Sequence, residues 1–251
     1  MSKEELKKGI LYIVSTPIGN RNDISLRAIQ KLKLSDKVLC ENKKQGAIIL
    51  RNANLSKPLD ELNEKNEKFK TQEVIADLLQ GRNISLISDS GTPVFEDPGL
   101  ALVRACINQN IDMEVIPGAS SIMTALVRSG FDLSSFVYGG FLSREPSERL
   151  QQLRELAKEK RTVALLETPY RLYAILSAAA KIMPDRNAYM GINLTMPFET
   201  HHYGTFDELR EKFEGQNLKA EFVICFEGLK SPDKTGSDKE KYKFPSKRFK
   251  K

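Results

Sequence analysis

The sequence has no apolar run that approaches the roughly 20 residues needed for a membrane-spanning helix. Its first segment, Met1 to Lys8, is mostly charged and lacks the apolar core of a signal peptide, so we expect no secretory signal. Cysteine is scarce, and two of the three cysteines, Cys40 and Cys225, lie in apolar runs. Buried, reduced thiols are therefore expected, which favours a cytoplasmic protein without disulfides.

Several common catalytic signatures are also absent. The sequence has no G-x-x-x-x-G-K-[ST] loop and no G-x-G-x-x-G after its first predicted strand, which argues against a P-loop nucleotidase and a Rossmann dinucleotide site. No Cys/His cluster has metal-ligand spacing, so no metal site is predicted. The only histidines, His201 and His202, are adjacent on a predicted strand. They should point to opposite faces, one at the surface and one packed.

The positive charge is concentrated at the C-terminus. Residues 229–251 contain nine basic and three acidic side chains, which accounts for the whole formal net charge of +6. The segment also contains prolines, a glycine and little apolar periodicity, so we predict a disordered basic tail. Such a tail can attract RNA phosphates, and a solvated tail without a function is the alternative.

Apolar runs alternate with helical periodicity from Ile10 to Gly228. Strands are predicted at residues 11–14, 37–40, 84–87, 113–116, 136–141, 162–166, 188–193, 200–204 and 221–226. Helices are predicted to begin near Asp23 and Asp97, and to span residues 71–79, 146–159 and 171–182. The pattern indicates two α/β domains, residues 1–117 and 118–228, with mainly parallel pairing in the first and some antiparallel pairing in the second.

The helix near Asp97 has a specific expected start. Asp97 is predicted to cap it and Pro98 to take the first helical position. Its apolar spacing predicts that Leu100, Val103 and Ile107 are buried.

Four turns rich in small residues and proline follow predicted strands. They are Thr16–Asn20, Ser88–Pro93, Pro117–Ser121 and Glu167–Arg171. Small residues let a ligand approach main-chain amides, and proline stiffens a loop. Because ligands of open α/β sheets bind at the carboxyl ends of strands, four such turns together indicate a ligand cleft, although each alone is an ordinary turn.

Taken in order, these motifs resemble the small-subunit ribosomal RNA (cytidine-2′-O)-methyltransferase family of the tetrapyrrole methylase superfamily. The resemblance extends from about Leu11 to Gly228. It rests on Leu11–Asn20 with Asp23–Ala28, Ser88–Pro93 with Asp97–Gly99, Ile116–Ser121, Gly140–Leu142, Glu167–Leu172, Phe198–Glu199 and Glu221–Gly228.

This resemblance implies two α/β domains with a cofactor cleft between them, a homodimer, S-adenosyl-L-methionine as cofactor, and ribosomal RNA or the small ribosomal subunit as partner. The implied cofactor-binding residues are Pro17, Gly19, Asp89, Gly91, Thr92, Pro93, Ser120, Ser121, Leu142, Leu194 and Phe222. The implied substrate-binding residues are Asn20, Lys44 and Arg144.

Methylation of a ribose hydroxyl benefits from a base and a nearby cation, because the hydroxyl is a weak nucleophile. Glu41 is the candidate base or orienting group, and Lys43 or Arg171 the candidate cation. Arg171 can instead hold a phosphate or pair with Glu167.

Two alternatives stay open. The electrically neutral body of the chain also suits a methyltransferase acting on a tetrapyrrole or another small molecule. The segment Ile192–Met196 stands where the family has Arg-Glu-Leu-Thr-Lys, which suits an inactive relative that only binds cofactor or RNA.

Overall fold

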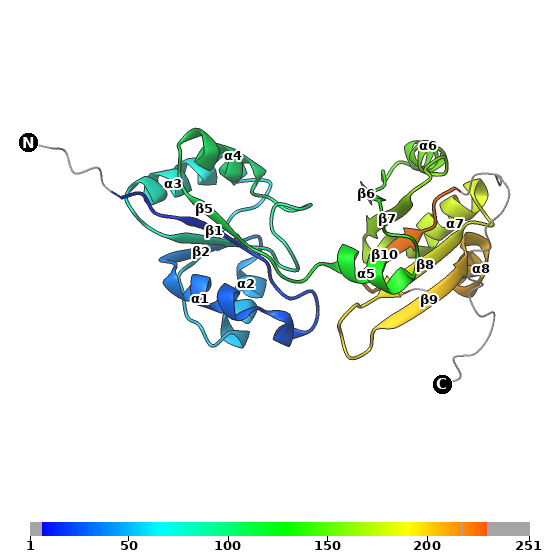
Figure 1. The fold of residues 1–251 in the computed structure, drawn as a ribbon, viewed down its shortest axis with the longest axis horizontal. Helices are drawn as coiled ribbons and strands as arrows, with labels where there is room; N and C mark the ends of the chain where they lie inside the picture. Colours follow the sequence, from blue (N-terminus) through cyan, green and yellow to red (C-terminus); the bar gives the residue numbers. More distant parts are fainter. Residues whose placement is uncertain (1–6, 217, 230–251) are drawn as a thin grey trace, which may run out of the picture. The chain divides into compact units, whose positions relative to one another are not determined.

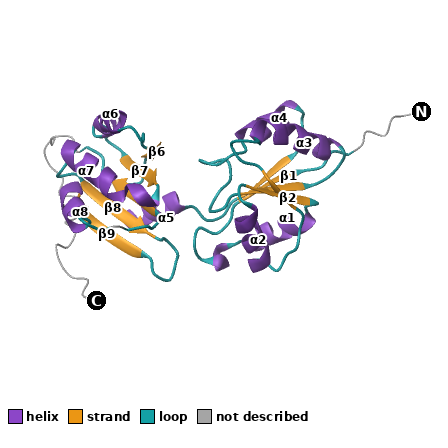
Figure 2. Ribbon diagram, turned by 180° about the vertical axis from the view of Figure 1, so that it is seen from behind, coloured by secondary structure: helices purple, strands orange, loops and turns teal. Residues whose placement is uncertain are grey.

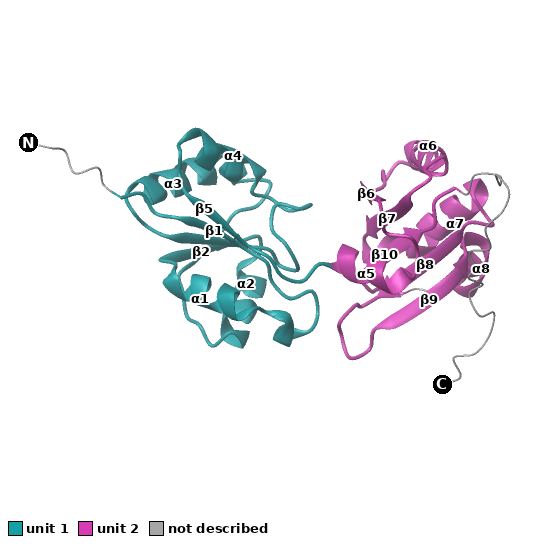
Figure 3. Cartoon of the chain, viewed as in Figure 1, with its two compact units in different colours: residues 1–120 teal, residues 121–251 magenta. Residues whose placement is uncertain are grey.

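The computed structural model describes residues 7–216 and 218–229. These residues form two compact units, one ending at Ser120 and the other beginning at Ser121 (Figure 3). Each unit has a five-stranded sheet packed with helices, which confirms the predicted α/β fold class. Apart from Leu229, the predicted tail lies outside the described residues. In the described part of the chain, no helix is long and apolar enough to cross a membrane.

The sheet of the first unit is parallel throughout, in the order β3-β2-β4-β1-β5. Its strands are β1 (Leu11–Val14), β2 (Lys37–Cys40), β3 (Leu59–Glu61), β4 (Ile84–Ile87) and β5 (Met113–Ile116). All except β3 coincide with predicted ranges. The sequence does not predict β3 because Leu59 is its only apolar residue.

Helices cover both faces of this sheet (Figures 1 and 2). They are α1 (Leu26–Leu34), α2 (Lys43–Asn52), α3 (Glu67–Leu79) and α4 (Leu100–Asn108), with a short 3-10 turn, η1, at Arg21–Asp23. One core cluster contains Leu32 of α1 and Leu50 of α2. A second contains Leu78 of α3 and Leu102 of α4. Helices α1 and α2 therefore cover one face, and α3 and α4 the other.

The predicted start of α4 is wrong. Its N-cap is Gly99, with φ of 130°, and not Asp97. The cap function is supplied from α3, because Glu67 Oε1 accepts hydrogen bonds from the main-chain N–H of Gly99 at 2.8 Å and of Ala101 at 3.1 Å. A carboxylate at this end also complements the helix dipole.

The predicted buried face of α4 is also wrong. Leu100 and Ile107 are 48% and 59% exposed, whereas Leu102 and Cys106 are fully buried; of the three predicted residues only Val103 packs against the core, and it is partly buried. This helix carries apolar residues around most of its circumference, so periodicity alone does not identify the stripe that faces the sheet.

The sheet of the second unit has mixed pairing, in the order β6-β7-β10-β8-β9. Its strands are β6 (Phe136–Phe141), β7 (Thr162–Glu167), β8 (Asn187–Ile192), β9 (Thr200–Thr205) and β10 (Phe222–Phe226). Strands β6 and β7 are parallel, and the other pairs are antiparallel. The predicted strands and the antiparallel component are confirmed, with ends that differ by one residue.

The helices of this unit are α5 (Ser121–Ser129), α6 (Pro146–Leu156), α7 (Leu172–Ile182) and α8 (Phe206–Lys212), with a 3-10 turn, η2, at Pro169–Arg171. Figure 2 shows α7 and α8 on one side of the sheet and α5 on the other. The main core cluster contains Phe222, Ile224 and Phe226 of β10, together with side chains of α6, α7 and α8. The alternate residues of β10 therefore face α5, which packs on β7, β8 and β10.

The two histidines do point to opposite faces. His201 lies 2.9 Å from the Tyr189 hydroxyl, whereas His202 lies against the ring of Phe213, which is in the main core cluster. The cysteines Cys40, Cys106 and Cys225 are buried and free, as predicted.

Candidate functional site

The first sheet has a topological switch at the carboxyl end of β4. The chain leaves β1 and β2 toward α1 and α2 on one face, and it leaves β4, which lies between them, toward α4 on the opposite face. Loops that diverge in this way leave a crevice at the carboxyl ends of the strands. This edge is therefore the place where a ligand of the first unit is expected.

Two of the predicted turns are joined at this edge. The main-chain N–H of Thr16 donates to the carbonyl of Gly91 at 2.8 Å, and the Thr16 hydroxyl donates to the carbonyl of Ser88 at 3.1 Å. The hydroxyls of Ser15 and Thr92 lie 3.0 Å apart. Because these contacts are mostly buried, the turns after β1 and β4 form one rigid structure.

Glycine allows the main chain to approach closely in these turns. Gly91 has φ of 86°, which a residue with a side chain adopts only with strain. A Cβ on Gly118 would lie 2.9 Å from the Cβ of Ser15, so the turn after β5 packs directly against the turn after β1. Three of the four predicted turns thus meet around β1.

The predicted cofactor residues of the first unit all lie on these three turns. They are Pro17 and Gly19 after β1, Asp89, Gly91, Thr92 and Pro93 after β4, and Ser120 after β5. The predicted substrate residue Asn20 is exposed, and its side chain caps η1 by accepting from the N–H of Asn22 at 3.0 Å.

Three carboxyl groups gather at the ends of β2 and β4. Burial, followed by the charges of Asp97 and Asp89, raises the pKa of Glu41. Burial is also the main cause that raises the pKa of Asp89 and that of Asp97. Among the described residues, no lysine or arginine forms an ion pair with any of the three. When ionised, these carboxyl groups can accept hydrogen bonds from hydroxyls of a ligand or bind a cationic group of it.

Asp97 is a member of this group that sequence reasoning treats only as a helix cap. Its side chain hydrogen bonds with Ser88, and its charge acts on Glu41. The loop between Thr92 and Gly99 turns back through residues with positive φ, including Val94 at 72°. A β-branched residue in that conformation has no sequence signature, so the return of Asp97 to the end of β4 is not predictable from the turn motif.

The predicted cation Lys43 and the predicted substrate residue Lys44 begin α2, which follows Glu41 after one residue. Asn42 caps this helix by accepting from the N–H of Lys44 at 2.8 Å, and its own N–H donates to Asp89 at 3.4 Å. Lys43 is exposed, with its Nζ 3.9 Å from a carboxyl oxygen of Asp60. The base candidate and both lysines therefore share this sheet edge.

The predicted residues of the second unit also gather at one edge of their sheet. The end of β7 and the end of β8 flank the start of β10, where Phe222 pairs with Glu167 and Ile192. Leu142 follows β6 at the same edge, and Leu194 follows β8. Leu142, Leu194 and Phe222 are buried, the first and last of them in the hydrophobic core. Ser121 begins α5, and Arg144 is exposed in the loop after β6.

Arg171 is held inside this edge. It forms the predicted pair with Glu167, at 3.5 Å, and donates to the carbonyl of Ser143 at 2.8 Å. The Glu167 side chain is 0% exposed, and burial raises its pKa although Arg171 acts in the opposite direction. The N–H of Leu142 also hydrogen bonds to Glu167. The pair thus anchors the loop that carries Leu142 and Arg144.

Comparison with known proteins gives a consistent result. The family described as Tetrapyrrole (Corrin/Porphyrin) Methylases matches residues 10–210. Three similar proteins are each named "Ribosomal RNA small subunit methyltransferase I". The one from Synechocystis sp. is 36% identical over 92% of this chain and 84% of its own length, that from Thermotoga maritima 34% over 88% and 99%, and that from Rickettsia prowazekii 38% over 89% and 79%.

Solved structures share the fold at lower identity. The uroporphyrin-III-C-methyltransferase of Thermus thermophilus aligns with a TM-score of 0.62 at 19% identity, covering 88% of this chain and 92% of that one. A cobalt precorrin-4 methyltransferase aligns with a TM-score of 0.67 at 16% identity, covering 87% and 94%.

Proposed function

Because the chain belongs to the tetrapyrrole (corrin/porphyrin) methylase family and, within it, to the group named ribosomal RNA small subunit methyltransferase I, we propose that it methylates small-subunit ribosomal RNA. The proposed reaction transfers a methyl group from S-adenosyl-L-methionine to the 2′-hydroxyl of a cytidine ribose.

The observation that carries the choice of acceptor is the contrast between two sets of relatives. Proteins named for ribosomal RNA are 34–38% identical across most of this chain. The structures named for porphyrin and precorrin acceptors are 16–19% identical, a level that supports only the shared fold. RNA is therefore favoured over a tetrapyrrole.

The residues at the edge of the first sheet fit the proposed cofactor. S-adenosylmethionine carries a positive sulfonium and a positive ammonium, and when bound it supplies a methyl group on a leaving sulfur. Asp89 and Asp97 are half-buried carboxyl groups without a described cationic partner, so a bound cation would stabilise their ionised forms. Gly91 lets the turn after β4 pack against the turns after β1 and β5, because a Cβ there would already lie 3.4 Å from Ile18 and 3.7 Å from the Ala119 carbonyl oxygen.

Glu41 is the proposed base. It lies beside Asp89 and Asp97, whose charges raise its pKa in addition to the effect of burial. A carboxylate with a raised pKa accepts a proton more readily near neutral pH, and it can take the proton that the ribose hydroxyl loses. We propose that Lys43 stabilises the negative charge on the acceptor, since this lysine begins α2 and so lies close to the base.

RNA contacts are assigned to exposed residues at the two sheet edges. Asn20 and Lys44 lie at the edge of the first sheet, and Arg144 lies on the loop that Glu167 and Arg171 anchor. Lysine and arginine bind phosphates, which supplies affinity without reading sequence. The proposed RNA substrate implies a cytoplasmic location. The family resemblance also predicts a homodimer, which light scattering can test.

The test begins with calorimetric titration of S-adenosylmethionine into the purified protein. Small ribosomal subunits that lack ribose methylation are then added, and the transfer of labelled methyl is followed. The proposal expects cofactor binding and label in RNA. Cofactor binding without any transfer to RNA would contradict the acceptor, and absence of cofactor binding would contradict the methyltransferase activity.

A variant pair tests the base. Glu41→Gln should lower the rate of transfer about 100-fold or more, with cofactor affinity changed little, because only proton acceptance is lost. Asp112→Asn is the matched control, since this exposed carboxyl group lies at the opposite end of the sheet, just before β5. Equal rates in both variants would exclude Glu41 as the base.

A further inference from the structure

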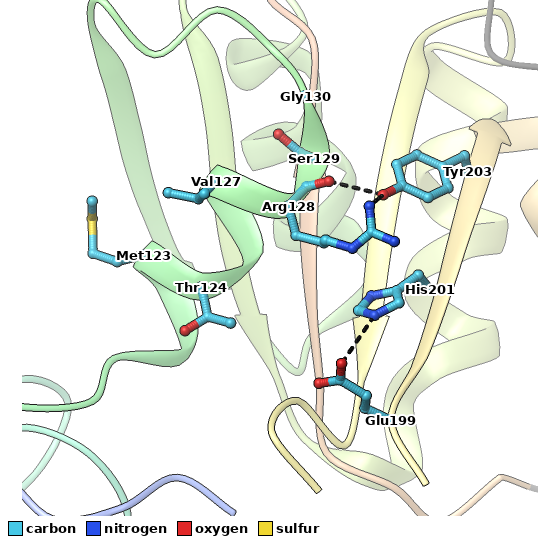
Figure 4. A pocket seen from close by; sticks show the side chains of 9 residues that line it. All are labelled: Met123, Thr124, Val127, Arg128, Ser129, Gly130, Glu199, His201 and Tyr203. Atoms are coloured by element: carbon cyan, nitrogen blue, oxygen red, sulfur yellow. Dashed lines mark hydrogen bonds and ion pairs between the residues drawn. The ribbon is translucent and has the colours of Figure 1, made fainter. Parts of the chain in front are cut away.

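The second unit contains a pocket that none of the residues assigned above lines. It has a volume of about 680 Å³ and lies between α5 and the β9 side of the sheet (Figure 4). Helix α5 contributes Met123, Val127 and Arg128, and the chain leading into and along β9 contributes Glu199, His201 and Tyr203. This volume lies within the range of small-molecule binding sites.

Arg128 brings a positive charge to this pocket. One guanidinium nitrogen donates to the Tyr203 hydroxyl at 2.8 Å, and that hydroxyl donates to the Arg128 carbonyl at 2.8 Å. The guanidinium carbon also lies 5.8 Å from the centre of the Tyr203 ring. In the described part of the chain, Arg128 forms no ion pair with a carboxylate. The charge is thus oriented by a neutral group and is available to an anionic ligand.

Aromatic rings form the wall on the sheet side. The lining rings are those of His201 and Tyr203, and the fully buried Tyr189 supports them, with its ring centre 5.0 Å from that of Tyr203 and 6.0 Å from that of His201. His201 is held through both ring nitrogens, by the Tyr189 hydroxyl at 2.9 Å and by Glu199 at 3.3 Å. A wall fixed in this way offers flat surfaces that do not need to be ordered when a ligand binds.

Two apolar side chains of α5 also border the pocket. Met123 and Val127 are 47% and 69% exposed, and Figure 4 shows them on the side of α5 away from His201 and Tyr203. Glu199 completes the polar lining, and its carboxylate accepts from the N–H of Thr195 at 2.7 Å. Carboxylates accept hydrogen bonds from the exocyclic amino group of cytosine. The pocket thus combines aromatic rings, bordering apolar side chains, an oriented cation and a carboxylate acceptor.

We propose that this pocket binds one unpaired nucleotide of the RNA substrate. The base stacks on the rings of His201 and Tyr203 beside α5, and its phosphate pairs with Arg128. Unpaired bases are recognised in this way, by stacking on aromatic side chains and by hydrogen bonds to their edges. The inference rests on the proposed RNA substrate, and it assigns to the second unit a contact separate from the edge of its sheet.

Methionine methyl signals provide a direct probe. The chain has six methionines, of which Met123 lies in the pocket, and Met183 and Met190 are buried in the same unit. Titration of a methyl-labelled protein with a short single-stranded pyrimidine RNA should shift the Met123 signal and leave the two buried signals in place. An unshifted Met123 signal at RNA saturation overturns the inference.

Two variants measure the contribution of the cation. Arg128→Ala should weaken RNA binding about five- to tenfold and reduce the slope of log affinity against log salt by about 0.7, the value for one single-strand phosphate contact. Arg154→Ala is the matched control, because Arg154 is an exposed arginine on α6 outside the pocket. Equal affinity and salt slope in both variants overturn the inference.

Two further readouts separate the inference from the proposed function and from self-association. If the wild-type protein methylates RNA while Arg128→Ala behaves as wild type, the pocket assignment fails and the proposed function stands. If Met123 shifts with RNA but no methyl is transferred, the proposed function fails and the pocket assignment stands. A change of association state in Arg128→Ala, measured by light scattering, would identify a second copy of the chain as the occupant and overturn the inference.

Discussion

Replacing Arg171 with methionine should remove the ion-pair partner of the buried Glu167 carboxylate and leave only the weaker electrostatic effect of Arg149. The Glu167 side chain is 0% exposed, and one of its oxygens has no hydrogen-bond partner among the described residues. Removing one partner of a buried ion pair costs about 3–5 kcal/mol. Because the N–H groups of Leu142 and Thr168 still hydrogen bond to Glu167, we expect a loss of about 2–4 kcal/mol for Arg171→Met near pH 8.

The loss should depend on pH, and its sign follows from the direction of the Glu167 pKa. Burial raises the folded-state pKa of Glu167 above its usual value, and Arg171 is the largest of the causes that lower it. Without Arg171 the pKa rises further. The folded state then binds more protons than the unfolded state over a wider range above about pH 4.5, so stability falls as pH rises through that range.

Urea unfolding at pH 5.5 and pH 8.0, followed through the methyl signal of Met190, measures this effect in the second unit. The double variant Glu167→Gln with Arg171→Met should recover most of the stability and lose the pH dependence, because the buried carboxylate is removed as well. A loss of equal size at both pH values, or a double variant as unstable as Arg171→Met alone, would refute the reasoning.

Three other predictions concern single groups. Gly91→Ala should weaken S-adenosylmethionine binding about tenfold in calorimetry, since φ of 86° costs a side chain about 1–2 kcal/mol; unchanged affinity would count against a role of this turn in binding. Burial, then Lys212 and His201, lower the pKa of His202 to about 4. The free energy of unfolding should therefore fall by about 1–2 kcal/mol, after solvent screening, as pH drops from about 6.5. Unfolding of His202→Gln should lack this pH-dependent loss. Glu67→Ala should destabilise the first unit by about 1 kcal/mol through loss of the α4 cap, while Glu67→Gln keeps most of the effect in a thermal unfolding assay.

The strands were the most predictable part of the fold, for a physical reason that also explains the failures. The strands β1, β2, β4 and β5 are short runs with at least three apolar residues, and β1, β2 and β4 are buried as the interior of a parallel sheet requires. Edge strand β3 is formed by pairing with β2 and not by its own composition. Helix α2 has adjacent apolar residues at Ile48 to Leu50 in place of a spaced pattern, and the sequence therefore does not reveal it.

The candidate site was predictable to the extent that it follows strand ends. The turns after β1, β4 and β5 carry recognisable glycine and proline patterns, and the parallel sheet brings them together. The approach of Asp97 to Asp89 depends instead on the path of a loop through positive φ values. The pocket beside α5 could not be predicted from the sequence, because Arg128 and Tyr203 are 75 positions apart. They meet only through the antiparallel placement of β9 beside β8.

The strand order of the first sheet also determines when that unit can fold during synthesis. Strand β1 is made before the rest of the sheet, yet its neighbours are β4 and β5, and Leu11 pairs with Ile84 and Met113. Such distant pairings are slow to form because long loops must close first. A nascent chain that ends before Ile84 thus contains β1 without either of the strands that pair with it, so both edges of β1 lack hydrogen-bond partners. The first unit can become complete only after Ile116 has left the ribosome, so any pause in translation before that point prolongs the time that β1 spends without its neighbours.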